Sequence, residues 1–179
     1  LDRFGQTPKT LLLTGLTGAG KSTIAYALER KLFDMGRAAF VLDGQNMRLG
    51  PSKDLGFDSD SRSENLRRSI EIAKLMNQAG IIAICSFVAP SEEVRQKARE
   101  SVGKHFIEVY LSAPLEVCRE RDQDGIYKAI ESDGIDTIPG VNLPYDVPSN
   151  PDVVLPTDEI SVEDSVERLL VVLEESEAF

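Results

Sequence analysis

Short apolar runs alternate with longer amphipathic stretches along the chain. The apolar runs, which we interpret as strands, fall at residues 10–15, 38–44, 81–88, 106–111 and 152–157. Most are apolar at consecutive positions, which is typical of strands buried on both faces. Helical spacing occupies residues 21–35, 62–79, 91–102, 114–121 and 161–175. This alternation predicts a three-layer α/β domain with a parallel sheet and helices on both of its faces.

Signals at the ends of the helical stretches agree with this assignment. Gly36 and Gly80 stand where glycine caps the carboxyl end of a helix. Ser91 stands where a helix would begin, and Ser161 does so together with Asp164. The helix boundaries are therefore predicted by capping residues as well as by spacing.

Two segments do not follow the alternation. Residues 122–150 contain repeated glycine and proline and only a short helical stretch, IYKAIE. A segment this long without a strand is more often a functional lid than a simple connection, although a surface loop is the alternative. Residues 1–9 begin without methionine and without an apolar signal segment, so we expect a linker or tail from a preceding domain. The domain itself is then expected to span residues 10–179.

Composition narrows the class of protein. The 179 residues carry a net charge of −10, which disfavours nucleic acid and anionic membrane as partners. No stretch approaches the roughly 18 consecutive apolar residues of a transmembrane helix. Cys85 and Cys118 lack metal-ligand spacing and are expected to be reduced thiols in a cytoplasmic protein. His105 is the one histidine and is expected to be structural.

The strongest motif lies between the first strand and the first helix. It fits G-x-x-x-x-G-K-[ST], and this strand–loop–helix context distinguishes a P-loop from a chance match. Its backbone N–H groups and the helix N-terminus attract phosphate oxygens. Lys21 is expected to reach the β- and γ-phosphates, and Ser22 to bind Mg²⁺. The nucleotide-binding residues are therefore Gly15, Leu16, Thr17, Gly18, Ala19, Gly20, Lys21, Ser22 and the following Thr23.

Other features favour a small-molecule kinase over other P-loop proteins. The N-K-x-D motif by which GTPases recognise guanine is missing from the sequence. Motor ATPases usually place an acidic residue at the end of an apolar strand, whereas the third strand here ends with Ser86. Small size and a lid-like segment complete the pattern of a kinase that acts on a small acceptor.

Polar residues after the second strand are candidates for the acceptor site. Asp43 ends that strand and could hold Mg²⁺-bound water or accept the proton of an acceptor hydroxyl. Arg62, Asn65 and Arg68 are spaced to share nearly one helix face, where they could clamp an anion. Phe57 is either a core aromatic or a ring that stacks on a base.

Several local sequences together resemble one known family. GLTGAGKST, LDGQNMR, KDLGF, R-x-E-N-x-R-R and SFVAP occur in that order, followed by RDQDGIYKA and PYDVPSNPDVVL. The set resembles adenylylsulfate (APS) kinase over nearly the whole chain from residue 10. LDG, LGF and R-x-E-N-x-R-R are far more specific than the P-loop alone.

The resemblance implies transfer of the γ-phosphate of MgATP to the 3′-hydroxyl of adenylylsulfate, giving 3′-phosphoadenylylsulfate (PAPS) in sulfate activation. Lys21 and Asp43 would serve catalysis. Ser86 matches a serine that is phosphorylated in some members, although polar contact is the role we favour for it. Arg121 matches a lid arginine that approaches ATP. The implied acceptor contacts are Asn46, Arg48, Phe57 by stacking, Arg62, Asn65 and the backbone of Val88 and Ala89. The family further implies a homodimer or higher oligomer and frequent fusion to an ATP sulfurylase domain.

Some positions depart from the family pattern. Gln45 replaces a carboxylate, Asp124 replaces a lid lysine, and Asp136 and Ile138 replace a lysine and an aromatic residue. Each charge reversal amounts to about 1 kcal/mol at 4 Å in water and about 4 kcal/mol at a dielectric of 20. A lost stacking ring costs roughly 1–3 kcal/mol. Three hypotheses stay open: an APS kinase with a weakened acceptor site, a degenerate kinase domain that binds nucleotide for assembly or regulation, and a kinase for another small acceptor.

Overall fold

A single five-stranded parallel sheet forms the centre of the computed structural model, which describes residues 4–122, 125–133 and 138–175. The strand order is β2-β3-β1-β4-β5. The strands are β1 (Thr10–Thr14), β2 (Ala39–Asp43), β3 (Ile82–Ser86), β4 (Phe106–Leu111) and β5 (Val153–Leu155). All five predicted strands and their parallel direction are confirmed, and their ends are shifted by at most two residues.

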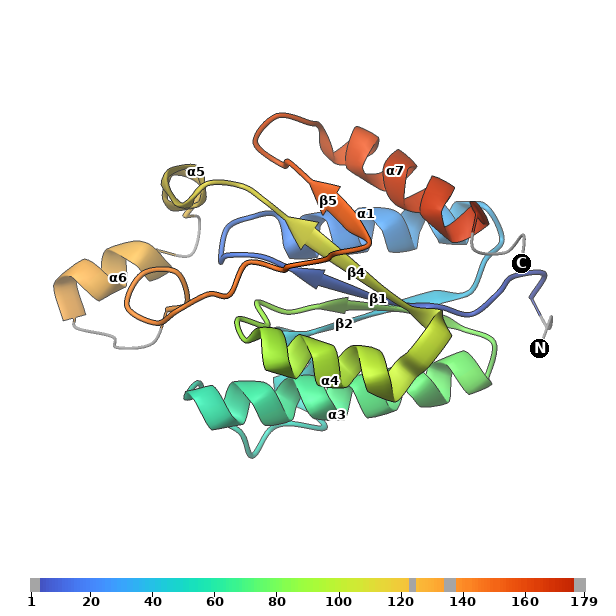
Figure 1. Ribbon diagram of the computed structural model, residues 1–179, viewed down its shortest axis with the longest axis horizontal. Helices are drawn as coiled ribbons and strands as arrows, with labels where there is room; N and C mark the ends of the chain where they lie inside the picture. The colour runs from blue at the N-terminus through green and yellow to red at the C-terminus, as the bar shows by residue number, and fades with distance from the viewer. Residues whose placement is uncertain (1–3, 123–124, 134–137, 176–179) are drawn as a thin grey trace.

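Two helices cover each face of the sheet (Figure 1). The pair α1 (Lys21–Asp34) and α7 (Val162–Glu175) lies on one face, and α3 (Ser59–Gln78) and α4 (Glu92–Val102) lie on the other. Alternate side chains of β1 supply two separate cores, because Leu11 and Leu13 pack beneath α1 and α7 whereas Leu12 packs beneath α3. The predicted three-layer architecture is confirmed.

Three short helices and one turn complete the described chain. They are α2 (Gly44–Leu49), α5 (Leu115–Glu120), α6 (Ile126–Asp133) and the 3₁₀ turn η1 (Gly103–His105). Helix α6 contains the short helical stretch noted in the sequence. Helix α2 was missed, because six residues are too few to show a helical period. Helix α3 begins at residue 59 instead of the predicted 62.

The capping signals are largely confirmed. Gly36 and Gly80 directly follow the C-caps of α1 and α3. The Ser161 hydroxyl accepts a 3.0 Å hydrogen bond from the Asp164 N–H ahead of α7. Ser91 is the N-cap residue of α4, but its side chain makes no capping hydrogen bond. Cys85 and Cys118 are free and buried, in agreement with the thiols expected there.

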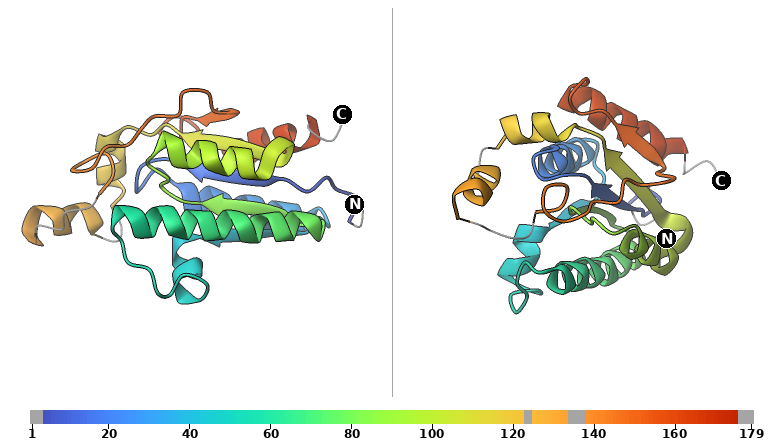
Figure 2. Two further views of the ribbon diagram at one scale, coloured as in Figure 1. Left: turned by 60° about the horizontal axis from the view of Figure 1, so that its bottom comes forward. Right: turned by 60° about the vertical axis from the view of Figure 1, so that its left-hand side comes forward.

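The carboxyl ends of the strands meet at one end of the molecule, and α5 and α6 lie at that end (Figure 2). Parallel α/β sheets bind ligands in the crevice beyond these strand ends. The geometry therefore points to this end for the functional site. No helix among the described residues is both long and apolar enough to span a membrane.

Candidate active site

A cavity of about 1400 Å³ opens at the carboxyl end of the sheet. Five parts of the chain line it: the P-loop with the start of α1, the α2–α3 region, residues 86–91 at and after the end of β3, described residues between 121 and 146, and residues 157–165 at the start of α7. The cavity therefore joins the predicted nucleotide site to the predicted acceptor site. This volume accommodates two nucleotide-sized ligands, since drug-sized ligands occupy sites of about 300–1000 Å³.

Close packing of the P-loop explains two of its glycines. A Cβ added to Gly15 would lie 2.8 Å from the carbonyl oxygen of Leu111 at the end of β4. At Gly18 the φ angle is +84° and an added Cβ would lie 2.7 Å from the carbonyl oxygen of Cys118. Both distances are shorter than real side chains tolerate, so the loop is held between β4 and α5. Residues 17–23 line the cavity, whereas Gly15 and Leu16 lie outside its lining.

Lys21 is held inside the loop that precedes it. Its Nζ donates hydrogen bonds of 3.0 and 2.7 Å to the carbonyl oxygens of Gly15 and Leu16. Burial lowers the pKa of Lys21 from 10.5 to about 8, because desolvation disfavours the charged form. The next residue, Ser22, places its Oγ 3.3 Å from the Oγ of Ser86 at the end of β3. The two hydroxyls therefore meet at one corner of the cavity, and Lys21 lines the same cavity.

The segment after β4 is tied to the P-loop by two sets of hydrogen bonds. Arg121 donates to the Thr157 carbonyl at 2.6 Å, and the Thr157 hydroxyl donates to the Ala19 carbonyl at 2.7 Å. In α6, the Tyr127 hydroxyl donates to the Thr17 carbonyl at 2.6 Å. Arg121 thus lines the cavity and is linked to the phosphate loop through Thr157. Tyr127 was missed, because no local signal relates it to a loop 110 residues earlier.

Asp43 both caps α2 and receives a hydrogen bond from α1. Its Oδ1 accepts from the Gln45 and Asn46 N–H groups at 2.9 and 2.7 Å, and its Oδ2 accepts from the Tyr26 hydroxyl at 2.8 Å. Strand register places it beside Ser86 on β3. A carboxylate has about four acceptor positions, so one is left for metal-bound water or a substrate hydroxyl. Burial and Asp43 together raise the pKa of Tyr26 to about 12.

Two arginines and an aromatic ring from the α2–α3 region form one wall of the cavity. The Arg48 guanidinium lies 4.3 Å from the centroid of the Phe57 ring, and Arg62 Nε donates to the Phe57 carbonyl at 2.7 Å. Burial lowers the pKa of both arginines, and the positive charge of Arg48 lowers that of Arg62 further. Phe57 is 63% exposed and lines the cavity, so it is not a core aromatic. An anion with an attached ring would complement this wall in charge and shape.

Asn65 adds a buried side-chain oxygen that accepts no hydrogen bond from the described residues. Its side chain is 1% exposed and lines the cavity. Within the described part of the chain, its Oδ1 has no hydrogen-bond partner. Buried polar atoms are almost always hydrogen-bonded, so an unpaired one beside a cavity favours a ligand contact.

Three predicted members of the acceptor site, Asp43, Asn46 and Arg68, are absent from the cavity lining. Arg68 forms a two-bond ion pair with Asp54, at 2.6 and 2.9 Å, and lies outside the cavity lining. The expectation that it shares the clamp of Arg62 and Asn65 is wrong. Asn46 also lies outside the lining, because its side chain bonds the backbone at Val41 and Asp43 in the α2 capping box.

The loop after β3 forms part of the cavity wall, including Ser86, Val88 and Ala89. Of the four departures from the family pattern, Gln45 is exposed on α2 and Ile138 is buried in the cavity lining. Asp124 and Asp136 lie outside the described residues. Groups of three or more His, Cys, Asp or Glu that could hold a metal ion are lacking in the described ranges.

Comparison with known proteins identifies the family. The family model described as adenylylsulphate kinase matches residues 7–156. The chain belongs to the adenylylsulphate kinase family. A relative from Clostridium kluyveri, an adenylyl-sulfate kinase, is 45% identical over 93% of this chain and 84% of its own length. A bifunctional enzyme CysN/CysC from Rhodopirellula baltica is 49% identical over 96% of this chain, which spans only 27% of that protein.

A solved structure extends the family match to three dimensions. The Mycobacterium tuberculosis APS kinase CysC, in complex with AMPPNP and APS, superposes with a TM-score of 0.88 at 37% identity. The alignment covers 94% of this chain and 99% of the mycobacterial chain. The kinase fold of the family is therefore present here over its full extent.

Proposed function

We propose that this chain transfers the γ-phosphate of ATP to the 3′-hydroxyl of adenylylsulfate and so produces PAPS. The observation that carries this proposal is one cavity that is lined by both the P-loop and the Arg48–Phe57–Arg62 wall. Membership in the adenylylsulphate kinase family supports the same reaction. The M. tuberculosis relative binds an ATP analogue together with APS, which is the pair of ligands that this cavity has room for.

On the donor side, residues 17–23 would hold the triphosphate through backbone N–H groups and the start of α1. Lys21 would move from the loop carbonyls to the β- and γ-phosphates and stabilise charge during transfer. Arg121 lies beside this loop and would contact ATP from the lid side.

The oxygen donors at this corner fit Mg²⁺, which prefers hydroxyl, carboxylate and phosphate oxygens. Ser22 would bind the ion, and Asp43 would hold one of its water molecules. When bound, Mg²⁺ would supply positive charge that offsets the negative charge of the phosphates during transfer.

On the acceptor side, Arg48 and Arg62 would bind the anionic groups of adenylylsulfate, Phe57 would stack on its adenine, and Asn65 Oδ1 would accept a hydrogen bond. Asp43 is suited to accept the proton of the 3′-hydroxyl. Ser86 would contribute polar contact through its neighbour Ser22, since direct transfer needs no covalent step.

The comparisons do not favour the degenerate alternative, because the relatives matched over most of the chain are kinases. We propose that the departures at Gln45, Asp124, Asp136 and Ile138 weaken acceptor affinity and leave transfer intact. We further propose a homodimer or higher oligomer, and fusion to a sulfate-activating domain of the kind that the bifunctional relative carries.

The test measures ADP release from MgATP over a range of adenylylsulfate concentrations, with Lys21→Ala as the inactive control. Saturable, Lys21-dependent release that is matched by PAPS supports the proposal, and a high KM places the weakness in acceptor binding. ATP binding without adenylylsulfate-dependent release would leave only a nucleotide-binding domain.

A further inference from the structure

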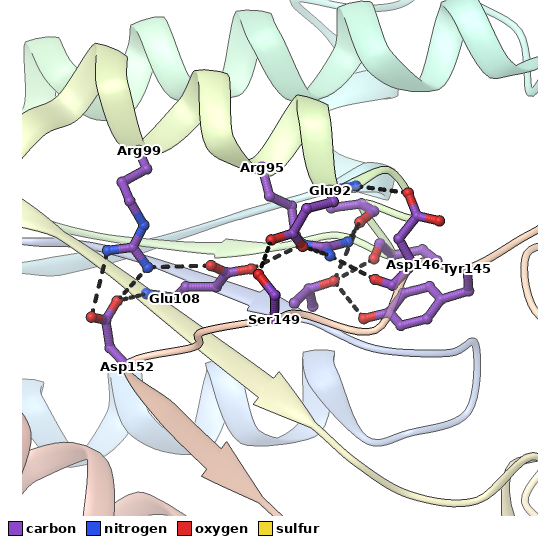
Figure 3. Close-up of polar contacts among 11 residues, drawn as sticks. Glu92, Arg95, Arg99, Glu108, Tyr145, Asp146, Ser149 and Asp152 are labelled. Carbon is purple, nitrogen blue, oxygen red and sulfur yellow. Dashed lines mark hydrogen bonds and ion pairs between the residues drawn. The ribbon is translucent and has the colours of Figure 1, made fainter.

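Arg95 lies behind the acceptor side of the cavity, on α4, and is 1% exposed (Figure 3). Its guanidinium donates to Glu108 Oε1 at 2.9 Å, to the Ala89 carbonyl at 2.6 Å and to the Asp146 carbonyl at 2.6 Å. It is also paired with Glu92, and it faces the Tyr145 ring at 5.7 Å from the centroid. One side chain thus joins β4, the loop after β3 and the C-terminal end of the lid segment.

The carbonyl that Arg95 holds belongs to a strained residue. Ala89 has a φ of +45°, and within the described chain it is the one non-glycine residue with positive φ. This conformation is unfavourable for a residue with a Cβ, because the Cβ approaches the following carbonyl oxygen. Backbone strain of this kind persists only where surrounding contacts determine it. The Arg95 hydrogen bond is one such contact, and Ala89 lines the cavity.

Val88, the residue before Ala89, is held by a hydrogen bond from Thr14. The Thr14 hydroxyl donates to the Val88 carbonyl at 2.6 Å and lies 2.9 Å from the Tyr145 hydroxyl. Tyr145 precedes Asp146, whose carbonyl Arg95 holds, in the segment 145–149 that we call the arm. The carbonyl oxygens of Val88 and Ala89 therefore both accept hydrogen bonds, from Thr14 and from Arg95, and both of these side chains contact Tyr145.

The arm at residues 145–149 is joined to the loop by further bonds. The Asp146 N–H donates to the Pro90 carbonyl at 2.8 Å, and the Asp146 carboxylate accepts from the Glu92 N–H at 3.0 Å. Ser149 donates to Glu92 at 2.8 Å. Loop and arm are consequently one hydrogen-bonded unit with Arg95 at its centre.

Stability alone gives little reason for a buried guanidinium here. Replacing buried ion pairs by well-packed apolar residues is often neutral or stabilising. What arginine provides is a planar set of five donors in fixed geometry, which can hold carbonyls from two chain segments at a defined separation. Lysine carries the same charge but cannot reproduce that fork.

We propose that Arg95 is a positioning residue for the acceptor substrate: by holding the carbonyls of Ala89 and Asp146, it aligns the cavity-lining loop 88–91 with the C-terminal arm of the lid. This inference rests on the proposed function, since the acceptor is taken to be adenylylsulfate. Among the described residues, no printed hydrogen bond or ion pair joins Arg95 to the P-loop, so we expect the effect to fall on the acceptor and not on ATP.

Arg99 provides a matched control on the same helix. It shares Glu108 with Arg95, at 3.2 Å, and pairs with Asp152 at 2.8 Å (Figure 3). Its described contacts lie at the outer end of the cluster and reach neither Ala89 nor Asp146. Arg95→Lys and Arg99→Lys are therefore the same chemical change at two distances from the loop.

The experiment measures kcat, the KM values for adenylylsulfate and MgATP, and the thermal midpoint for both variants and for Thr14→Val. We expect Arg95→Lys to raise the adenylylsulfate KM about tenfold or more, as expected for one lost charge-assisted hydrogen bond, with the MgATP KM within about twofold. Thr14→Val, which keeps Arg95 and removes one bond to Val88, shifts the same KM in the same direction. Arg99→Lys leaves both KM values unchanged. Equal KM changes in the two arginine variants, or KM changes that merely follow the thermal midpoint, would overturn the inference.

A second readout separates this inference from the reaction itself. If the unmodified protein shows no adenylylsulfate-dependent turnover, the proposed function fails and amide hydrogen exchange decides the positional role. Arg95→Lys is expected to speed exchange at residues 88–91 and 145–149 together, with Arg99→Lys leaving both segments protected. Unchanged exchange in Arg95→Lys would refute the role of Arg95 independently of catalysis.

Discussion

Raising the pH from 7 to 9 should weaken ATP binding through Lys21. Burial in the P-loop lowers the pKa of this residue to about 8. A triphosphate requires the ammonium form, which falls from about 90% of molecules at pH 7 to about 10% at pH 9 for a pKa of that size. Apparent affinity scales with the fraction of the binding-competent form, so the Kd for MgATP should rise about tenfold.

Isothermal titration calorimetry at pH 7, 8 and 9, in two buffers with different heats of ionisation, measures the Kd for MgATP and the number of protons taken up on binding. The sign of the proton transfer follows from the charges. Phosphate raises the pKa of Lys21 in the complex, so binding takes up a proton. The uptake should grow from about 0.1 proton per ATP at pH 7 to about 0.5 at pH 8 and about 0.9 at pH 9.

Lys21→Arg is the matched control, because a guanidinium stays protonated throughout this range. Its ATP affinity, whatever its absolute value, should be flat from pH 7 to 9 and independent of the buffer. A Kd for the unmodified protein that is also flat, without proton uptake at pH 9, would refute the assignment of a lowered pKa to Lys21.

Four further substitutions, the last of them a control, test separate parts of the site. Gly18→Ala should abolish measurable ATP binding in a fluorescent-nucleotide titration, because the added methyl would lie 2.7 Å from a carbonyl oxygen of α5 at a φ of +84°; retained affinity would show that the loop relaxes. Ser86→Ala should keep turnover within about tenfold, as expected for loss of one hydrogen bond, and complete loss would favour a covalent intermediate. Phe57→Ala should raise the adenylylsulfate KM about 5- to 150-fold, equivalent to roughly 1–3 kcal/mol of stacking. Arg68→Ala should leave that KM unchanged, because its partners Asp54, Glu64 and Pro51 lie outside the cavity lining; an equal rise in both variants would contradict the placement of the acceptor.

Local signals explain why the sheet and the P-loop were predictable from the sequence. Each strand is a short run of consecutive apolar residues, and the glycine spacing of residues 15–22 occurs between a strand and a helix. These features depend on neighbours in the chain and need no knowledge of distant contacts. The same holds for Gly36 and Gly80, which follow helices directly.

The errors at Arg68 and Arg95 arise because the partners of these side chains are distant in the sequence. Helix spacing places Arg68 near the face of Arg62 and Asn65, but Asp54 lies close enough in space to form an ion pair with it. In sequence, Arg95 is one of several charged residues in an amphipathic helix. Its burial depends on Glu108 and on the carbonyl of a residue 51 positions later. No local pattern indicates either partner.

Phosphate transfer to one defined hydroxyl tests the central claim most directly. The protein would be incubated with MgATP and adenylylsulfate, and the product identified by mass spectrometry and ³¹P NMR, with Lys21→Ala alongside. The account predicts one new phosphate on the 3′-hydroxyl of adenylylsulfate for each ADP formed, and none with Lys21→Ala. Release of the γ-phosphate as inorganic phosphate, with adenylylsulfate unchanged, would contradict it.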